Sequence, residues 1–302
     1  MSAHNDSLPD YKGRFAPSPT GPLHLGSLYT ALASFLQARS KQGQWFIRID
    51  DLDTPRNIKG ADSDILKTLE TFGLCWDGEV FYQSQQLETY QAFIEQLTQE
   101  EKVYPCTCSR KTLAAFHSES NIYPQFCRDK TAIPAKPYAL RLKTVSVNIG
   151  FEDFLQGRIC HNIAEKDGDF IIKRKEGIIA YQFAVVIDDH LQQITEVVRG
   201  FDLLDCTPPQ LYLHQLLNLK PPTYLHVPII THQNGQKLSK QNLAQAVDCQ
   251  NPAKTLFYLL TLLKQQPPLD LQQVSIDELL NWAIQNWQPL ALKNTHALAA
   301  IE

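Results

Sequence analysis

The stretch from Gly13 to Leu28 constrains the fold of this chain more than any other. A short apolar run ends at Phe15 and Ala16, prolines occupy positions 17, 19 and 22, and an apolar-periodic segment begins near His24. Because proline fits neither the interior of a helix nor a central strand, it restricts the backbone to one route between the two elements. The stretch therefore predicts a strand, a rigid loop and a helix, in that order.

The start of that helix is a candidate anion site. Its first-turn N–H groups would point into the loop, Gly26 would let a charged ligand approach the backbone, and His24 adds a donor. A second phosphate-type signal, Lys237-Leu-Ser-Lys240, lies far downstream and follows Gly235. We expect His24, Lys237 and Lys240 to bind phosphate groups, since two such signals in one chain are much rarer than one.

The elements after this loop follow an α/β rhythm. Residues 29–38 have a helical pattern, residues 45–49 form a β-rich run that leads into Asp50, and residues 87–97 are helical again. This order predicts an α/β fold with a doubly wound parallel sheet. Asp50 would then stand at the carboxyl end of a strand, where ligands bind in open α/β sheets.

The rhythm breaks over residues 104–175, which hold a cysteine cluster, prolines and short strand-like runs. We interpret this segment as an inserted subdomain between two halves of a nucleotide-binding domain, residues 1–103 and 176–241. The last part, residues 242–302, has helical patterns, and Ser275 is placed to cap its final helix.

The inserted segment contains a candidate metal site. Cys106 and Cys108 form a Cys-x-Cys pair, and Cys127 follows within one small loop. Zinc prefers four ligands of the N, S or O type, so one more ligand is needed. From the residues alone the fourth ligand stays open among His117, Tyr123 and Asp129. Three inert thiols in a small loop-rich subdomain are the alternative.

Charge, hydrophobicity and cysteine usage argue against several classes of protein. The net charge is −4 and the isoelectric point is about 6.1, so an RNA partner would need a local basic surface. The first ten residues lack a secretory signal, and the most apolar run, residues 256–263, is too short to span a bilayer. The seven cysteines do not spread as a disulfide framework. We expect a cytoplasmic protein without a membrane partner.

The two phosphate-type motifs together resemble the signatures of class I aminoacyl-tRNA synthetases. Residues 14–21 with His24-Leu-Gly-Ser27 resemble the first signature, and Lys237-Leu-Ser-Lys-Gln241 resembles the second. The form Arg-Phe-Ala-Pro-Ser-Pro-Thr-Gly resembles the glutamate-specific branch, and most closely a shortened group of paralogues within it. The resemblance extends over about residues 12 to 290 and implies the Rossmann-like class I fold.

The resemblance implies a glutamate site, and the chemistry of the residues agrees with it. Arg14 and Arg199 suit carboxylates, Asp50 can hold an ammonium group, and Tyr181 would add a hydroxyl donor. The family usually carries glutamate where this chain has Asp50, so the ammonium would move or a water would bridge. The implied glutamate-binding residues are Arg14, Phe15, Ala16, Pro17, Ser18, Asp50, Tyr181 and Arg199.

The resemblance also implies the cofactors. ATP with Mg²⁺ would contact His24, Gly26 and Lys240, with His24, Lys237 and Lys240 as the catalytic residues. One structural zinc ion would be held by a set in which Tyr123 is the fourth ligand. That set is Cys106, Cys108, Tyr123 and Cys127.

The acceptor implied by the resemblance is unusual. The roughly sixty residues after Lys240 suffice for a few helices and not for a β-barrel anticodon-reading domain. The shortened paralogues transfer glutamate to queuosine at the wobble position of tRNA(Asp), which implies that the anticodon stem-loop enters the active-site cleft. We expect a monomer. A minimal glutamyl-tRNA synthetase that charges a tRNA 3′ end, and a non-catalytic paralogue that binds tRNA, are the alternatives.

Other polar residues receive no catalytic role from the sequence. His190, His214 and His226 have no partners at ligand spacing and are expected to be ordinary core or polar residues. The pair Asp188-Asp189 is expected to cap a turn. Pro209 stands where relatives commonly carry arginine after Thr-Pro, so a nucleic-acid contact by that arginine would be lost.

Overall fold

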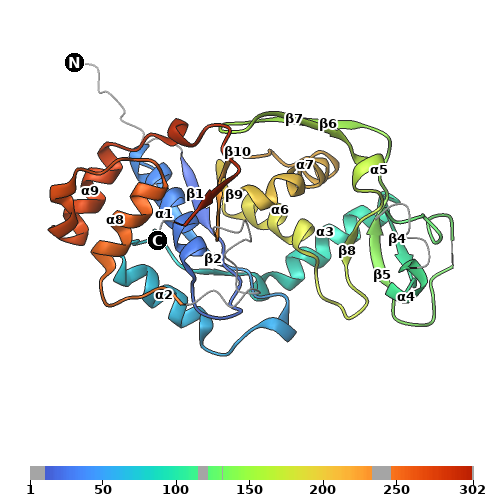
Figure 1. Cartoon of the computed structure of the whole chain (residues 1–302). Helices are drawn as coiled ribbons and strands as arrows, with labels where there is room; N and C mark the ends of the chain where they lie inside the picture. The colour runs from blue at the N-terminus through green and yellow to red at the C-terminus, as the bar shows by residue number, and fades with distance from the viewer. Residues whose placement is uncertain (1–10, 115–121, 131, 233–245, 301–302) are drawn as a thin grey trace, which may run out of the picture.

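The computed structural model describes residues 11–114, 122–130, 132–232 and 246–300. The molecule is elongated, with the terminal helices at one end and the small antiparallel sheet of the inserted segment at the other (Figure 1). Lys237, Lys240 and His117 lie outside the described residues.

A parallel sheet forms the centre of the molecule, as the sequence predicts. β1 pairs with β2 and β2 with β3, while β9 pairs with β10, all in parallel. The two groups meet where Lys12 and Thr195 exchange hydrogen bonds of 2.9 Å. The strands are β1 (Lys12–Phe15), β2 (Gln44–Ile49), β3 (Phe81–Tyr82), β9 (Glu196–Gly200) and β10 (Thr223–Val227).

The sheet is covered on both faces, because successive strand residues enter different apolar cores. Val198 packs in a core with α1, α8 and α9, whereas its neighbour Val197 packs in a second core with α3, α6 and α7. Side chains alternate between the faces of a strand, so two cores on one strand mean two buried faces. The helices are α1 (Leu25–Ser40), α2 (Ala61–Thr71), α3 (Leu87–Gln99), α6 (Tyr181–Leu191), α7 (Thr207–Leu216), α8 (Pro252–Leu262) and α9 (Ile276–Gln285).

The inserted segment contains an antiparallel sheet and a long hairpin. β4 (Val103–Cys106), β5 (Ala139–Leu142) and β8 (Ile171–Lys173) form the sheet, beside the short helix α4 (Arg110–Ala114). The sequence reasoning missed the hairpin, which runs back along the molecule and joins the central sheet where Asp153 pairs with Tyr224 of β10. The hairpin strands and the short helix that follows are β6 (Asn148–Asp153), β7 (Gly157–Asn162) and α5 (Ile163–Lys166).

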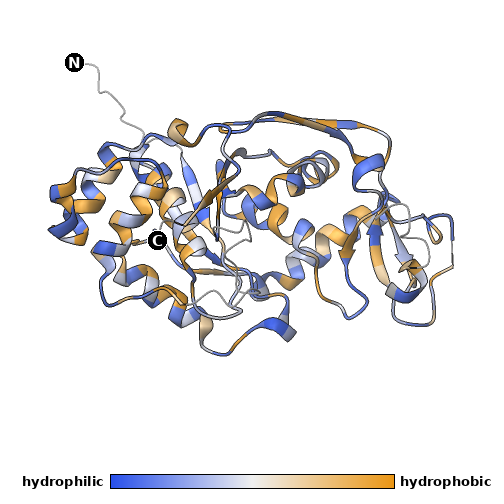
Figure 2. Cartoon of the chain, viewed as in Figure 1, coloured by the Kyte–Doolittle hydropathy of each residue, from blue (hydrophilic) through white to orange (hydrophobic). Residues whose placement is uncertain are grey.

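The C-terminal region consists mainly of α8 and α9, as predicted, with polar and apolar residues on different sides of each helix (Figure 2). Ser275 caps α9 by accepting a hydrogen bond of 3.2 Å from the backbone N–H of Glu278. An unpredicted strand, β12 (Ala297–Ala299), pairs in parallel with β11 (Ile229–Thr231). Within the described ranges, none of the helices combines the length and the apolar character needed to cross a membrane.

Candidate active site

A cavity of about 700 Å³ opens where β1 and β9 end and α1 begins. Every described residue that the sequence assigns to glutamate or ATP lines it, although these residues come from distant parts of the chain. Those lining residues are Arg14, Phe15, Ala16, Pro17, Ser18, His24, Gly26, Asp50, Tyr181 and Arg199. The position of the cavity agrees with ligand binding at the carboxyl ends of parallel strands.

His24 is the N-cap of α1. Its Nδ1 accepts a hydrogen bond of 3.2 Å from the backbone N–H of Ser27, so Nε2 carries the proton and lies 2.9 Å from the Ser27 hydroxyl. The described chain resumes at Ala246, which lies beside His24. Ala246 forms a β-bridge with His24, and the N–H of Val247 donates to the carbonyl of Leu23. The residues just after the segment with Lys240 therefore lie against the start of α1.

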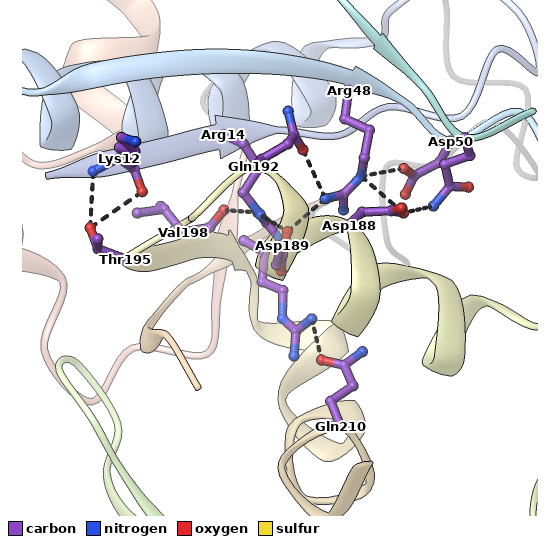
Figure 3. Close-up of polar contacts among 12 residues, drawn as sticks. Lys12, Arg14, Arg48, Asp50, Asp188, Asp189, Gln192, Thr195, Val198 and Gln210 are labelled. Atoms are coloured by element: carbon purple, nitrogen blue, oxygen red, sulfur yellow. Dashed lines mark hydrogen bonds and ion pairs between the residues drawn. The ribbon is translucent and has the colours of Figure 1, made fainter. Parts of the chain in front are cut away.

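Arg14 stands at the end of β1 and is only 4% exposed. Its Nε donates to Oδ1 of Asp189 at 3.1 Å, and its Nη1 donates to the carbonyl of Val198 at 3.4 Å (Figure 3). These contacts fix the guanidinium between β1, β9 and α6. A cation in this position can bind a carboxylate in the cavity.

Arg48 lies beside Arg14 and is wholly buried. Its Nε donates to Oδ1 of Asp50 at 2.8 Å, and its Nη1 donates to Oδ1 of Asp189 at 2.6 Å (Figure 3). Burial raises the pKa of Asp50, whereas the attraction of Arg14 and Arg48 outweighs burial at Asp189 and lowers its pKa. Arg48 thus fixes the carboxylate that the sequence assigns to the ammonium group.

Asp188 and Asp189 do not cap a turn, contrary to the prediction. Both are buried within α6 and belong to the network around Arg48. Asp188 accepts hydrogen bonds of 2.6 Å from the Tyr90 hydroxyl and from the amide of Gln83. Burial is the main reason that the pKa of Asp188 rises to about 7.

Arg199 stands at the end of β9 and is held from several sides. Its Nη2 donates to the Thr207 hydroxyl at 2.8 Å, and its Nη1 donates to Oε1 of Gln210 at 2.9 Å and to the Tyr181 hydroxyl at 3.5 Å. Its Nε donates to Nε2 of His226 at 3.0 Å. His226 is a buried core histidine, as expected, and the fold supplies its ring with polar partners that the sequence did not indicate.

The cysteines of the inserted segment come together as predicted. The sulfurs of Cys106, Cys108 and Cys127 lie within 4.8 Å of one another, and in the described part of the chain no His, Asp or Glu joins them. The Tyr123 hydroxyl lies 3.3 Å from the sulfur of Cys106 and 3.5 Å from that of Cys108. Three sulfurs and one phenol oxygen form a donor set that fits a tetrahedral zinc ion, and Asp129 is not part of it.

Comparison with known proteins identifies the family. The family described as "tRNA synthetases class I (E and Q), catalytic domain" matches residues 11–254. The chain belongs to this family of class I tRNA synthetases. The glutamyl and glutaminyl branch of the class I synthetases thus accounts for the two signature motifs of the sequence.

Curated class I synthetases similar to the chain share nearly its full length. It is 45% identical to a protein named glutamyl-Q tRNA(Asp) synthetase from Ectopseudomonas mendocina over 289 residues, covering 96% of this chain and 97% of the relative. A protein of the same name from Methylococcus capsulatus is 46% identical over 288 residues, covering 95% and 94% of the two chains.

A solved class I synthetase has the same fold. The glutamate tRNA ligase of Elizabethkingia meningosepticum, in complex with its amino acid, superposes with a TM-score of 0.80 at 25% identity. The alignment covers 97% of this chain and 67% of the ligase.

Three residues that support the site were missed from the sequence. Arg48 holds Asp50, Asp189 holds Arg14 and His226 holds Arg199. Arg48 could have been noticed, because a charged residue inside the apolar run of β2 needs a buried partner. Asp189 and His226 carried no comparable signal. Pro209 lies in the first turn of α7, which proline tolerates.

Proposed function

We propose that this chain activates glutamate with ATP and Mg²⁺ to form glutamyl-adenylate, without tRNA, and transfers the glutamate to queuosine at the wobble position of tRNA(Asp). The observation that carries the first step is the placement of Arg14 and Arg199 at the ends of adjacent strands in one cavity. Support for the second step comes from relatives of nearly equal length that bear the name glutamyl-Q tRNA(Asp) synthetase.

Glutamate would bind through its charged groups. Arg14 and Arg199 would each take a carboxylate, and Tyr181, whose side chain is partly exposed at the cavity, would donate its hydroxyl. Asp50 would hold the ammonium group. Because Arg48 already donates to Oδ1 of Asp50, the ammonium would approach the other side of this carboxylate, directly or through a water.

ATP would bind at the start of α1. Gly26 offers space beside the backbone. The Nε2–H of His24, which faces the Ser27 hydroxyl in this structure, would turn to phosphate oxygens when ATP binds. Lys237 and Lys240, which lie outside the described residues, would add positive charge as pyrophosphate leaves. The glutamate carboxylate would attack the α-phosphate in line, so the residues act by positioning and by stabilising charge.

The inserted subdomain, residues 104–175, would carry one structural zinc ion. Cys106, Cys108, Tyr123 and Cys127 would fill all four positions, which leaves no site for a catalytic water. The two halves of the catalytic domain would be residues 1–103 and 176–241, followed by the helical region 242–302. We propose that the enzyme acts as a monomer in the cytoplasm.

The acceptor would reach the cavity as a single-stranded loop. Proteins read RNA best where bases are splayed out of a helix, as in an anticodon loop. The nucleophile would be a hydroxyl of the cyclopentenediol ring of queuosine. The anticodon stem-loop would then occupy the mouth of the cavity in place of a tRNA 3′ end.

The activation step is tested by ATP–pyrophosphate exchange with each amino acid, in the presence and absence of tRNA. We expect exchange with glutamate alone and without tRNA. Exchange with aspartate or glutamine at a rate equal to that with glutamate would contradict the assignment of the two arginines to glutamate.

A further inference from the structure

A buried chain of three polar residues leads to the cavity from its far side. Asp153 ends β6, His226 lies in β10, and Arg199 ends β9. Oδ2 of Asp153 lies 2.6 Å from Nδ1 of His226, and Nε2 of His226 lies 3.0 Å from Nε of Arg199. Asp153 is 1% exposed and His226 is 0% exposed, so water does not compete for these contacts.

The chain of contacts fixes the tautomer of His226. A guanidinium nitrogen can only donate, so Nε2 of His226 must accept from Arg199. The ring proton then resides on Nδ1 and is donated to Asp153. Burial is the main cause that lowers the pKa of His226, which keeps the ring neutral and Nε2 able to accept.

Asp153 is itself held by the backbone. Its Oδ1 accepts from the N–H groups of Leu155 at 3.0 Å and Gln156 at 2.9 Å, and its Oδ2 also accepts from the N–H of His226 at 3.1 Å. A carboxylate with this many fixed donors stays in place. The orientation of the imidazole therefore follows from the turn that ends β6.

We infer that Asp153 and His226 are positioning residues that lock the guanidinium of Arg199 in the orientation that receives a carboxylate of glutamate. This inference rests on the proposed function. Nε of Arg199 is engaged by His226, Nη1 by Gln210 and Nη2 by Thr207, so the guanidinium plane is fixed before the substrate arrives. A preorganised plane loses less entropy when it binds a carboxylate.

Two variants at one position test this role. In His226→Gln the amide oxygen can take the place of Nε2 and accept from Arg199. In His226→Asn the shorter amide reaches only the place of Nδ1, next to Asp153. We expect the KM for glutamate in ATP–pyrophosphate exchange to rise about tenfold to a hundredfold in the Asn variant and about threefold or less in the Gln variant.

The KM for ATP should stay within about twofold of wild type in both variants, because Arg199 acts on glutamate. Equal increases in the glutamate KM for Gln and Asn, in variants with equal unfolding temperatures, would overturn the positioning role. A KM for ATP that rises together with the KM for glutamate would also overturn the positioning role.

An independent readout does not need activity. Long-range ¹H–¹⁵N correlation spectra of protein with labelled histidine distinguish the two tautomers, and the His226→Gln spectrum identifies the His226 signal among the nine histidines. We expect the Nδ1–H tautomer in wild type. We expect a smaller fraction of the Nδ1–H tautomer in Asp153→Asn, where an amide replaces the carboxylate that accepts this proton.

An Nε2–H or doubly protonated His226 in the wild type would overturn the positioning role of Asp153 and His226, even if glutamate exchange is normal. This spectrum decides the matter if a variant fails to fold. Absence of glutamate-dependent exchange in a wild type that shows the Nδ1–H tautomer would instead reject the proposed function on which the positioning role rests.

Discussion

Nε of Arg14 lies 3.1 Å from Oδ1 of Asp189, which joins the end of β1 to α6. The same oxygen accepts from Nη1 of Arg48 at 2.6 Å. One carboxylate oxygen thus holds two buried arginines, one that lines the cavity as a candidate ligand for glutamate and one that holds Asp50. The network joins four charged residues, Arg14, Arg48, Asp50 and Asp189, into a single rigid unit.

Replacing Asp189 with Asn should impair glutamate binding, although Asp189 is not itself assigned a contact with glutamate. The amide keeps one acceptor but loses the charge shared by Arg14 and Arg48, so both guanidinium groups lose an ionic partner. We expect kcat/KM for glutamate in pyrophosphate exchange to fall about tenfold to a hundredfold. Asp205→Asn, which removes an exposed partner of Lys166, is the control and should leave exchange unchanged.

Replacing Arg14 or Arg199 with Ala should have a larger effect, because each change removes the proposed contact to a substrate carboxylate. We expect a loss of about 2–4 kcal/mol in kcat/KM for glutamate, the range for removing one partner of a desolvated charge pair. Arg174→Ala, which breaks an exposed pair with Asp53, serves as the control for exchange without tRNA. A cavity arginine whose removal leaves glutamate kinetics intact has been assigned the wrong role.

Much of the site could be predicted because its signals are local in sequence. The prolines before His24, the carboxylate after a β-rich run and the Cys-x-Cys pair each combine residue type with short spacing. Short spacing constrains geometry directly, so the cavity and the cysteine cluster followed from it.

The supporting contacts could not be predicted, because they join residues far apart in the chain. Arg48 and Asp189 are 141 positions apart, and Asp153 and His226 are 73 positions apart. Their pairing depends on which strands become neighbours. The β6–β7 hairpin that brings Asp153 to the central sheet was itself missed. A buried charge can be recognised from a single sequence, but its partner can be identified only from the fold.

The cysteine cluster predicts one tightly held zinc ion per chain. Elemental analysis of protein purified without chelator should give a zinc-to-protein ratio near one, and Cys108→Ser should lower both the ratio and the unfolding temperature. Chelator treatment should lower the unfolding temperature of wild type, because metal binding to the folded state contributes directly to stability. Cys249→Ser, at an exposed thiol, is the control. Protein that contains no metal would contradict this prediction.

His214 should make stability depend on pH. Burial is the main cause that lowers its pKa from 6.5 to about 4. Between pH 4 and pH 6.5 the unfolded chain therefore binds a proton at His214 that the folded chain does not bind. The stability contribution is complete above pH 6.5 and is lost as the pH falls. At pH 5 the loss should be about 2 kcal/mol relative to pH 8.

The measurement for His214 is the free energy of unfolding in urea at pH 8 and pH 5 for wild type and His214→Leu. The variant should lose about 2 kcal/mol less than wild type over this interval. His232→Gln, at an exposed histidine, should behave as wild type. Equal pH slopes in wild type and His214→Leu would contradict a depressed pKa at this position.

The transfer of glutamate to queuosine in the anticodon loop can be tested directly. The direct measurement is transfer of radiolabelled glutamate to tRNA(Asp) with and without queuosine, with the 3′ terminal adenosine present and with it removed. Omission of ATP is the control for activation. With ATP, queuosine-containing tRNA(Asp) should be labelled whether or not its 3′ terminal adenosine is present. Equal labelling of queuosine-free tRNA(Asp), or labelling of tRNA(Glu) at its 3′ adenosine, would contradict it and identify a minimal glutamyl-tRNA synthetase.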